Sequence, residues 1–322
     1  MLVIDPRGGL GNRLMALTSA RILAEEIGCD IRVAWEFVPS YFTSPISALF
    51  EDMVSVPLPA MERAADYRHF HHVPGPVPEV EARLRAGETV LMSSWCFIRP
   101  EGMAQRDFDE RLHRQYASLK PLPSLVARVP ALPEGTIGVH IRRCDNWRTT
   151  RYSPLALFFR VLDRHCRSEP ATRFFLASDS PEVVSQVSDR YGQRILATTG
   201  TGEHGVAGAQ SALVDMLTLA RTRLIYHGFM SSFAYTAHLI SRRPIRCVSV
   251  PRLPAGWHDS PSDARHDRLM EWNQEARAWQ KRARPDATFS TRLQAELVLL
   301  WTRVVCSDPF QHWPLRRMRR IA

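Results

Sequence analysis

One short segment, TIGVHIRRCDNW at residues 136–147, gathers several residues that could do chemistry. The pattern predicts a buried β-strand that delivers His140, Arg142 and Arg143 at its carboxyl end, with Asp145 two residues further on. Adjacent guanidinium groups stay charged and offer planar donors that match the oxygens of a phosphate. Because ligands of open α/β sheets bind at the carboxyl ends of the strands, the segment indicates a site for a phosphate-bearing ligand, held without an obvious metal.

The residues of this segment also have ordinary structural interpretations. Alternation along the strand places His140 and Arg142 on one face with Gly138, which favours a role for His140 in positioning the ligand. A single histidine in a strand is more often a core residue, and two arginines after a strand can form a structural ion pair. Asp145 follows closely enough to hold one of the arginines in place.

A second signal lies at the start of the chain, where residues 1–17 are MLVIDPRGGLGNRLMAL. A short apolar strand runs into Gly8, Gly9 and Gly11 and then into a helix, so backbone can pass close to a ligand and the helix can bind an anion. Leu14 stands where a dinucleotide fingerprint needs its third glycine, and no Walker loop follows. The segment indicates anion binding without identifying the ligand.

The elements that must position these residues alternate between strand and helix patterns. In the first part we predict strands at 2–4, 30–35 and 89–92, helices at 10–27 and 104–118, an irregular stretch at 53–80 and a linker at 121–135. In the second part we predict strands at 136–141, 173–177, 194–198, 223–227 and 245–250, and helices at 154–167, 181–191, 210–221 and 232–242. This order predicts a parallel sheet covered by helices. Further helices are predicted at 261–283 and 290–305.

Other polar residues fall at the ends or on the faces of these elements. Asp179 ends a predicted strand and could bind a guanine edge or a ribose hydroxyl, or be the N-cap of the next helix. Ser231 and Ser232 precede an apolar helix as N-caps do, and the N–H groups of that helix would suit a phosphate. A polar helical stripe either lines the ligand or is a solvated face; its members are Ser211, Asp215, Thr218 and Thr222.

Composition is that of a globular protein. The 322 residues are 45% hydrophobic and 23% charged, and the apolar runs are too short to span a membrane. The first residues lack a signal-peptide pattern, and the six cysteines are scattered without a paired spacing. We therefore expect a reduced, cytoplasmic environment, without disulfides or a zinc site.

The chain is strongly basic, with a net charge of +9 and almost no lysine. A GC-rich genome explains the arginines without function, whereas attraction to a nucleotide sugar, a lipid surface or nucleic acid explains them functionally. The last residues, FQHWPLRRMRRIA, mix aromatics with arginines. They predict either a terminal helix packed on the first domain with a frayed end, or a peripheral contact with an anionic membrane at its inner face.

Together the segments resemble the fucosyltransferase superfamily, in particular its rhizobial nodulation α-1,6-fucosyltransferases. The GGLGNRL loop and the later HIRRxD are two of the matching motifs. FFLASDSPEVV at 174–184 and SALVDMLTLARTRLIYHGFMSSFAYTAHLIS at 211–241 are two more. The resemblance covers residues 1–35 and 105–250 and leaves 36–104 and the segment beyond 250 unmatched.

The resemblance implies an α/β fold of the GT-B type, with two Rossmann-like domains facing a cleft. Residues 1–125 would form the acceptor-side domain, 136–250 the nucleotide-sugar domain, and 251–322 a helical extension with a basic tail. The reaction would be inverting transfer of fucose from GDP-fucose to a glycan or glycolipid hydroxyl. GDP-fucose would be a co-substrate, with no further cofactor, no metal and no nucleic-acid partner.

The resemblance also implies the roles of individual residues. Arg142, Arg143 and Asp145 would be catalytic, with Arg142 at the β-phosphate and Arg143 supporting the same pocket. The donor-binding residues would be Gly9, Gly11, Asn12, His140, Arg142, Asp179, Ser231 and Ser232, with Asp215 as a further support. The arginine pair would replace a metal at the departing diphosphate, since no DxD pair follows a strand.

The proton acceptor is the part of the site that the sequence does not identify. Some relatives carry a glutamate about ten residues after the motif histidine, where it could act as a general base. Here that window, DNWRTTRYS, has Asp145 as its only carboxylate. Asp5 and Glu36, at the ends of first-domain strands, are alternatives. Cys144 stands where the family often has glycine, which alters the loop or places a thiol near the site.

Three other functions stay open at this point. The chain could use another nucleotide sugar, bind nucleic acid through its basic surface, or bind a sugar nucleotide without catalysis because a base is missing. No basic run with interleaved aromatics occurs outside the short tail, which counts against nucleic acid. The acceptor is not identifiable, and we expect residues 36–104 to contribute its specificity.

Overall fold

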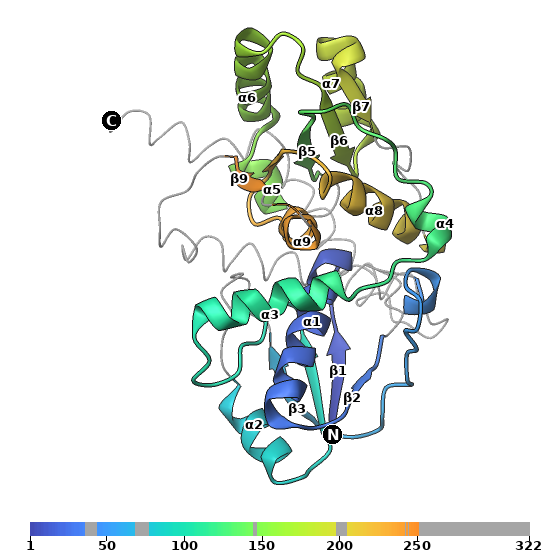
Figure 1. Ribbon diagram of the computed structural model, residues 1–322, viewed down its shortest axis with the longest axis vertical. Helices are drawn as coiled ribbons and strands as arrows, with labels where there is room; N and C mark the ends of the chain where they lie inside the picture. Colours follow the sequence, from blue (N-terminus) through green and yellow to red (C-terminus); the bar gives the residue numbers. More distant parts are fainter. Residues whose placement is uncertain are drawn as a thin grey trace, which may run out of the picture. The chain divides into compact units, whose positions relative to one another are not determined.

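The computed structural model describes residues 1–35, 44–67, 77–143, 147–197, 205–241, 243 and 245–250. These residues belong to one compact unit, Met1–Pro251, and form two parallel β-sheets with helices packed on them (Figure 1). The predicted fold class, α/β with parallel sheets, is confirmed. The predicted helical extension and basic tail lie outside the described residues, and the cleft between two domains stays a prediction.

The first sheet has the strand order β2-β1-β4-β3, with every neighbouring pair parallel. Its strands are β1 (Leu2–Pro6), β2 (Ile31–Val33), β3 (Arg63–Tyr67) and β4 (Val90–Ser94). We call the part of the chain that carries this sheet the first half, and the part that carries the other sheet the second half. The helices of the first half are α1 (Leu10–Ile27), η1 (Ile46–Ala48), α2 (Pro78–Arg85), α3 (Gln105–Ala117) and α4 (Pro123–Val126). Helix α1 ends at Gly28, whose φ of 72° is the left-handed conformation that closes a helix.

The second sheet has the order β7-β6-β5-β8-β9 and is also parallel throughout. Its strands are β5 (Ile137–Ile141), β6 (Phe174–Ser178), β7 (Ile195–Ala197), β8 (Leu224–His227) and β9 (Arg246–Ser249). Its helices are α5 (Trp147–Tyr152), α6 (Leu155–Ser168), α7 (Pro181–Tyr191), η2 (Gly192–Arg194), α8 (Gly205–Leu219) and α9 (Ser232–Ile240). Alternate residues of β6 face α6 and α7 on one side and α8 and α9 on the other.

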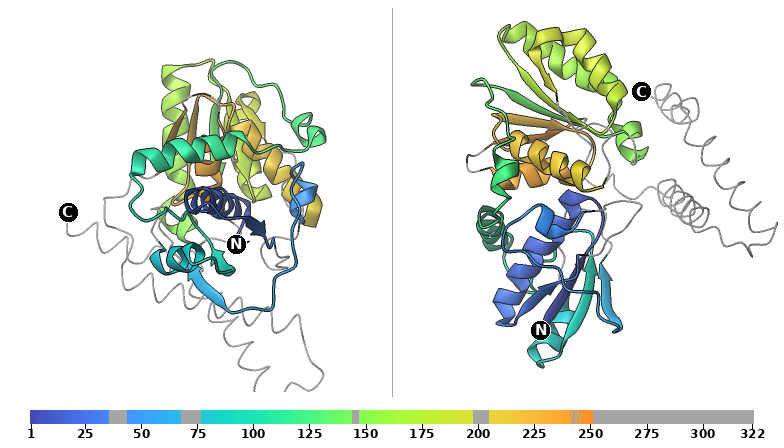
Figure 2. Two further views of the ribbon diagram at one scale, coloured as in Figure 1. Left: turned by 60° about the horizontal axis from the view of Figure 1, so that its bottom comes forward. Right: turned by 90° about the vertical axis from the view of Figure 1, so that its right-hand side faces the viewer.

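The two halves share a hydrophobic core. Leu14 and Leu17 of α1 and Phe108 of α3 belong to the same buried cluster as Met216 of α8 and Ala234 of α9. Figure 2 shows α1 next to the helices on that face of the second sheet. Because apolar side chains from both halves are buried together, separating the halves would expose part of a common core to water.

Most predicted elements agree with the structure within two residues, and α1 and α7 agree at both ends. The prediction of an irregular stretch at 53–80 was wrong in part, because β3 and the start of α2 lie there. Pro78 occupies the first turn of α2 together with acidic residues, which is an ordinary helix start. The surrounding prolines obscured that signal. The predicted linker at 121–135 contains the single helical turn α4.

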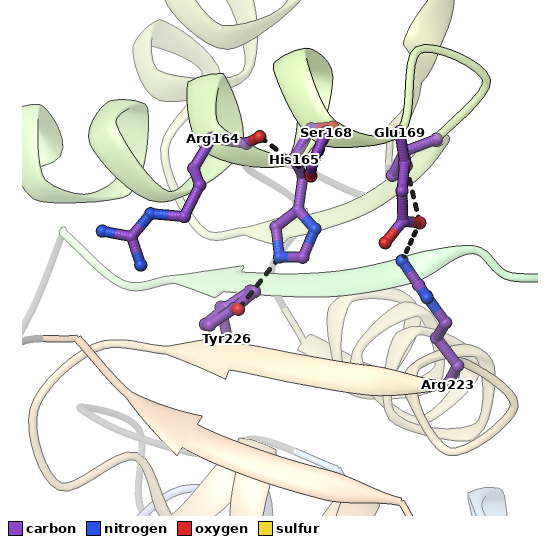
Figure 3. A network of polar contacts seen from close by, with 7 residues as sticks. Arg164, His165, Ser168, Glu169, Arg223 and Tyr226 are labelled. Carbon is purple, nitrogen blue, oxygen red and sulfur yellow. Dashed lines mark hydrogen bonds and ion pairs between the residues drawn. The ribbon is translucent and has the colours of Figure 1, made fainter.

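A polar network joins α6 to β8 on the other face of the second sheet (Figure 3). His165 Nε2 lies 3.0 Å from the Tyr226 hydroxyl, and Arg223 pairs with Glu169 just beyond α6. The Nδ1 atom of His165 is buried without a hydrogen-bond partner. Burial lowers the pKa of His165 below its ordinary value; the nearby arginine charges act in the same direction and Glu169 opposes them.

A second half-buried histidine lies where α3 contacts α9. The rings of His238 and His113 have centroids 6.3 Å apart, and Nδ1 of His238 is buried without a hydrogen-bond partner. Burial is the main cause that lowers the pKa of His238, and the positive charge of His113 lowers it further. A hydrogen bond with the backbone of Ile245 opposes both.

The two half-buried histidines should make the protein less stable in acid. The fold holds His165 and His238 neutral where the unfolded chain, with histidine pKa values of about 6.5, binds protons, so the free energy of unfolding should fall below that pH. Replacing both with glutamine should flatten the dependence of Tm on pH between about 7 and 5. His113→Gln, which removes only the neighbouring charge, should flatten it less. An unchanged slope in the double variant would contradict this explanation.

Candidate functional site

The strand order of the second sheet places its ligand crevice at the ends of β5 and β8. The chain continues from β5 to β6 on one side, while β8 pairs with β5 on the other. Ligands of open parallel sheets bind at such a switch point. Here it carries Arg142 just after β5 and the loop 228–231 just after β8, where the Gly228 N–H donates to the His140 carbonyl at 3.3 Å. The arginine motif therefore lies where the sequence argument expects a ligand.

His140 is buried and connects β5 to the first turn of α9. Its Nδ1 lies 2.8 Å from Ser231 Oγ, and its ring stacks on Phe233 with centroids 4.8 Å apart. Ser231 is the N-cap of α9, as predicted, and accepts from the Ala234 N–H at 3.1 Å. His140 is thus a satisfied core histidine that also fixes α9 beside the switch point. Its contact with a donor stays a prediction.

Both adjacent arginines are half-buried, and the side chain of Arg143 is held by two backbone carbonyls. The guanidinium of Arg143 donates to the Arg142 carbonyl at 2.8 Å and to the Ser153 carbonyl at 2.7 Å. Burial lowers the pKa of Arg143, and the carboxylate of Asp179 opposes the shift, so the side chain remains a cation at neutral pH. These contacts fit the supporting role predicted for Arg143, and the contact of Arg142 with a ligand stays a prediction.

Asp179 follows β6 and holds the arginine loop in place. Its Oδ1 accepts from the backbone N–H of Arg143 at 2.7 Å. The alternative that Asp179 caps the next helix is wrong, because Ser180 caps α7 by accepting from the Val183 N–H at 3.3 Å. The carboxylate therefore ties together the ends of two adjacent strands. Its contact with a nucleotide stays a prediction.

The glycines after β1 have different structural explanations. Gly8 has a φ of 82°, and a Cβ added there would lie 2.9 Å from the Trp95 ring. A Cβ on Gly11 would lie 2.8 Å from the backbone of Ser232, so Gly11 is needed for α1 to pass close to α9. A Cβ on Gly9 would meet nothing within 4 Å. Of the three, Gly9 is the one that leaves space for a ligand.

Asn12, in the first turn of α1, contacts both halves of the chain. Its Nδ2 donates to the Trp95 carbonyl at 2.6 Å, and its Oδ1 accepts from Ser232 Oγ at 2.6 Å. Trp95 follows β4 at the carboxyl edge of the first sheet. The structure thus brings together two residues, Asn12 and Ser232, that the sequence assigns to the donor site. Their contacts with a donor stay predictions.

The predicted polar stripe is largely buried; three of its members lie on α8, and Thr222 lies in the turn after it. Thr218 and Thr222 donate to carbonyls of the preceding turn at 2.7 Å, and Ser211 Oγ accepts from Arg128 at 3.1 Å. These three members have little exposed surface, so the solvated-face interpretation is wrong for them. The supporting role of the fourth member, half-buried Asp215, stays a prediction.

The candidate proton acceptors differ in their placement. Asp145 and Glu36, like Cys144, lie outside the described residues. Asp5 has no exposed surface; it accepts from Ser93 Oγ at 2.7 Å and pairs with Arg7. Its Oδ1 is buried without a hydrogen-bond partner. Because the carboxylate is fully enclosed, an acceptor hydroxyl does not reach it in this structure, and a catalytic role for Asp5 stays a prediction. Within the described residues, no three His, Cys, Asp or Glu side chains are grouped to hold a metal ion, and metal independence stays a prediction.

Two residues that support the crevice were not found from the sequence. Ser153 is buried, and its Oγ accepts from the Phe229 N–H at 2.8 Å. A Cβ on Gly228 would lie 2.5 Å from the Thr149 side chain. Ser153 precedes a proline and Gly228 follows a predicted strand, which are ordinary loop signals. Neither signal identifies the distant contact, which is with Phe229 for Ser153 and with Thr149 for Gly228.

A surface hollow of about 750 Å³ lies at the other end of α1. Its walls come from the C-terminal turns of α1 and α3 and the start of β2, and include Arg21, Glu25, Arg114 and Gln115. Glu25 and Gln115 are hydrogen-bonded to each other. None of the residues at the switch point lines this hollow, so the candidate site is defined by the strand ends instead.

The fold of the chain is similar to that of solved fucosyltransferase structures. No protein-family model and no curated protein matches the chain. It is similar to the solved structure of POFUT1 in complex with GDP, with 12% identity, 78% of this chain and 98% of that chain covered, and a TM-score of 0.53. For the POFUT1 complex with GDP-fucose, the identity is 12%, the match covers 77% of this chain and 96% of that chain, and the TM-score is 0.50. For fucosyltransferase NodZ from Bradyrhizobium, the identity is 21%, the match covers 74% of this chain and 93% of that chain, and the TM-score is 0.49. The predicted resemblance to the fucosyltransferase superfamily is confirmed at the level of the fold.

Gly9 and Gly11 should respond differently to the same substitution. Gly11→Ala places a methyl group against the backbone of Ser232 and should lower the free energy of unfolding by about 1–3 kcal/mol. Gly9→Ala finds open space and should change it by less than about 1 kcal/mol, the usual size of an N-cap effect. Chemical denaturation of both variants measures the difference. Equal losses would show that the contact at Gly11 does not constrain the fold.

Proposed function

We propose that the chain is an inverting glycosyltransferase that moves fucose from GDP-fucose to a hydroxyl of a glycan or glycolipid. The observation that carries the proposal is that Arg142 follows β5 at the switch point of the second sheet, where His140 of the same strand contacts Ser231, the N-cap of α9. A guanidinium and a helix N-terminus together suit a diphosphate. The fold likeness to POFUT1, whose structures hold GDP and GDP-fucose, supports this donor.

In this reaction the bond between the anomeric carbon and the diphosphate breaks, and GDP leaves with the electron pair. The acceptor oxygen forms the new bond from the opposite face and gives its proton to a base, for which Asp145 is the candidate. Negative charge grows on the β-phosphate, so preorganised positive charge there lowers the barrier. Arg142 and the first turn of α9 would supply it, while Gly9 leaves room for the donor beside α1.

We also propose that transfer needs no metal ion. The guanidinium of Arg142 stays protonated at any working pH and presents several donors in one plane. It can therefore take the part that a divalent cation plays on the diphosphate in other transferases. Arg143 would support this charge indirectly, because its hydrogen bonds hold the loop that carries Arg142.

The test is to incubate the full chain with GDP-fucose and a panel of glycan and glycolipid acceptors in excess chelator. A mass gain of one deoxyhexose on an acceptor is the expected result. Parallel reactions with GDP-mannose and UDP-glucose test the use of another donor. Transfer that is lost in chelator and restored by manganese would contradict metal independence. GDP binding without transfer from any donor would favour a non-catalytic protein.

Arg142→Ala should abolish most transfer while leaving the fold intact. Losing one preorganised donor to developing charge costs on the order of 100–1000-fold in kcat. Arg142→Lys should recover little of this loss, because lysine lacks the planar pair of donors. Arg160→Ala, at an exposed position on α6, is the matched control and should keep normal turnover. Near-normal kcat in Arg142→Ala would remove Arg142 from the mechanism.

The C-terminal tail suggests where the acceptor is met. We propose a peripheral contact between residues 308–322 and an anionic membrane surface, because Arg316, Arg317, Arg319 and Arg320 stand near Phe310 and Trp313 in the sequence. Each basic residue near such a surface contributes about 1 kcal/mol, within a Debye length of roughly 8 Å. No helix among the described residues is long and apolar enough to cross a bilayer.

Deleting residues 308–322 should reduce co-flotation with anionic liposomes and spare transfer to a soluble acceptor. Replacing the four tail arginines with glutamine is the matched control, since it removes the charge and keeps the aromatic residues. Binding should fall in both variants and should also fall at high salt in the full chain. If the full chain floats no better than the truncated one, the tail has no membrane role.

A further inference from the structure

The hydrogen bonds of Asn12 join the switch points of the two sheets. In the first sheet β1 pairs with β2 on one side and with β4 on the other. Its crevice therefore lies between the turn after β1, at Gly8, and the turn after β4, at Trp95. Asn12 bonds the Trp95 carbonyl at this crevice and Ser232 at the crevice of the second sheet. We call this pair of bonds the Asn12 bridge.

The Trp95 end of the Asn12 bridge is held firmly by the first half. On one side of Trp95, the Arg7 N–H donates to the Ser94 carbonyl at 2.8 Å. On the other side, the Ile98 N–H donates to Ser19 Oγ, inside α1, at 3.0 Å. The carbonyl of Trp95 is therefore fixed relative to β1, β4 and α1.

The Ser232 end of the Asn12 bridge leads to the donor side. Ser232 is the first residue of α9 and is buried. Its neighbour Ser231 caps the same helix and contacts His140. A shift of Ser232 would move the first-turn N–H groups of α9 and the His140 contact together. The close approach at Gly11 keeps α9 within reach of the Asn12 carboxamide.

We infer that Asn12 is a positioning residue, which sets the place of the first turn of α9 relative to the first sheet and thereby orders the site for the donor diphosphate. The inference rests on the proposed function for the identity of that ligand. It replaces the direct donor contact that the sequence resemblance implies for Asn12. A carboxamide suits this role because it donates through nitrogen and accepts through oxygen at the same time.

The test compares Asn12→Ala, Ser232→Ala and the double variant in the full chain. Thr236→Val is the matched control, because Thr236 Oγ1 donates to the Gly11 carbonyl at 3.4 Å across the same pair of helices, one turn further along α9. Amide hydrogen exchange of residues 232–235 without ligand reports how readily the first turn opens to solvent. Calorimetric titration with GDP, at a temperature where all variants are folded, reports the donor site.

Asn12→Ala and Ser232→Ala should each speed exchange at 232–235 and weaken GDP binding roughly tenfold, the size of one lost hydrogen bond. The double variant should be no worse than the single ones, because both remove the same interaction. Thr236→Val should leave exchange at 232–235 and GDP affinity unchanged, even if it lowers Tm.

Several results would overturn the inference. Loss of GDP affinity in Asn12→Ala but not in Ser232→Ala, or additive losses in the double variant, would mean that the side chains touch the ligand directly. An equal loss in Thr236→Val would mean that any bond between these helices has the same effect. Unchanged amide exchange at 232–235 in Asn12→Ala and Ser232→Ala would overturn the inference, whether or not the affinity for GDP changes. If the unaltered chain binds no GDP, the proposed donor is wrong, and the exchange data alone decide the role of Asn12.

Discussion

The close approach of α1 to α9 at Gly11 is the constraint on which the candidate site depends. It brings together the first turns of two helices, so two positive helix ends face the same small region. Like ends of helix dipoles repel one another, and the burial of a common apolar core behind them offsets that cost. An anion bound between the helix ends would remove the repulsion. The way the halves meet therefore suits the diphosphate of the proposed donor.

The parts of the site that the sequence predicted are those governed by local rules. The period of apolar residues and the closing glycine define α1, and Pro181 after a short polar turn defines the start of α7. The βαβ order then places the arginine motif at a strand end. One local prediction failed in part because proline-rich surroundings hid the start of α2, and one of the two alternatives for Asp179 is wrong because Ser180 caps α7.

What could not be predicted are contacts between residues far apart in the chain. Asn12 and Ser232 are 220 residues apart, and helical periodicity shows which face of a helix is apolar without showing which helix covers it. Arg142 and Arg143 look equivalent in the sequence. The hydrogen bond from Arg143 to the Ser153 carbonyl, which fits the supporting role predicted for Arg143, depends on the position of a residue ten places further along the chain.

The residues around the crevice of the second sheet are joined by one connected set of hydrogen bonds. Asp179 after β6 accepts from the Arg143 backbone, the Arg143 side chain donates to Ser153, and Ser153 accepts from Phe229 after β8. Three strand ends are therefore tied together by the protein's own groups before any ligand binds. In the proposed transfer, a charge held in place this way would need no reorganisation when negative charge develops on the leaving group. The Asn12 bridge extends the same arrangement to the first sheet, so the strand ends of both sheets belong to one hydrogen-bonded framework.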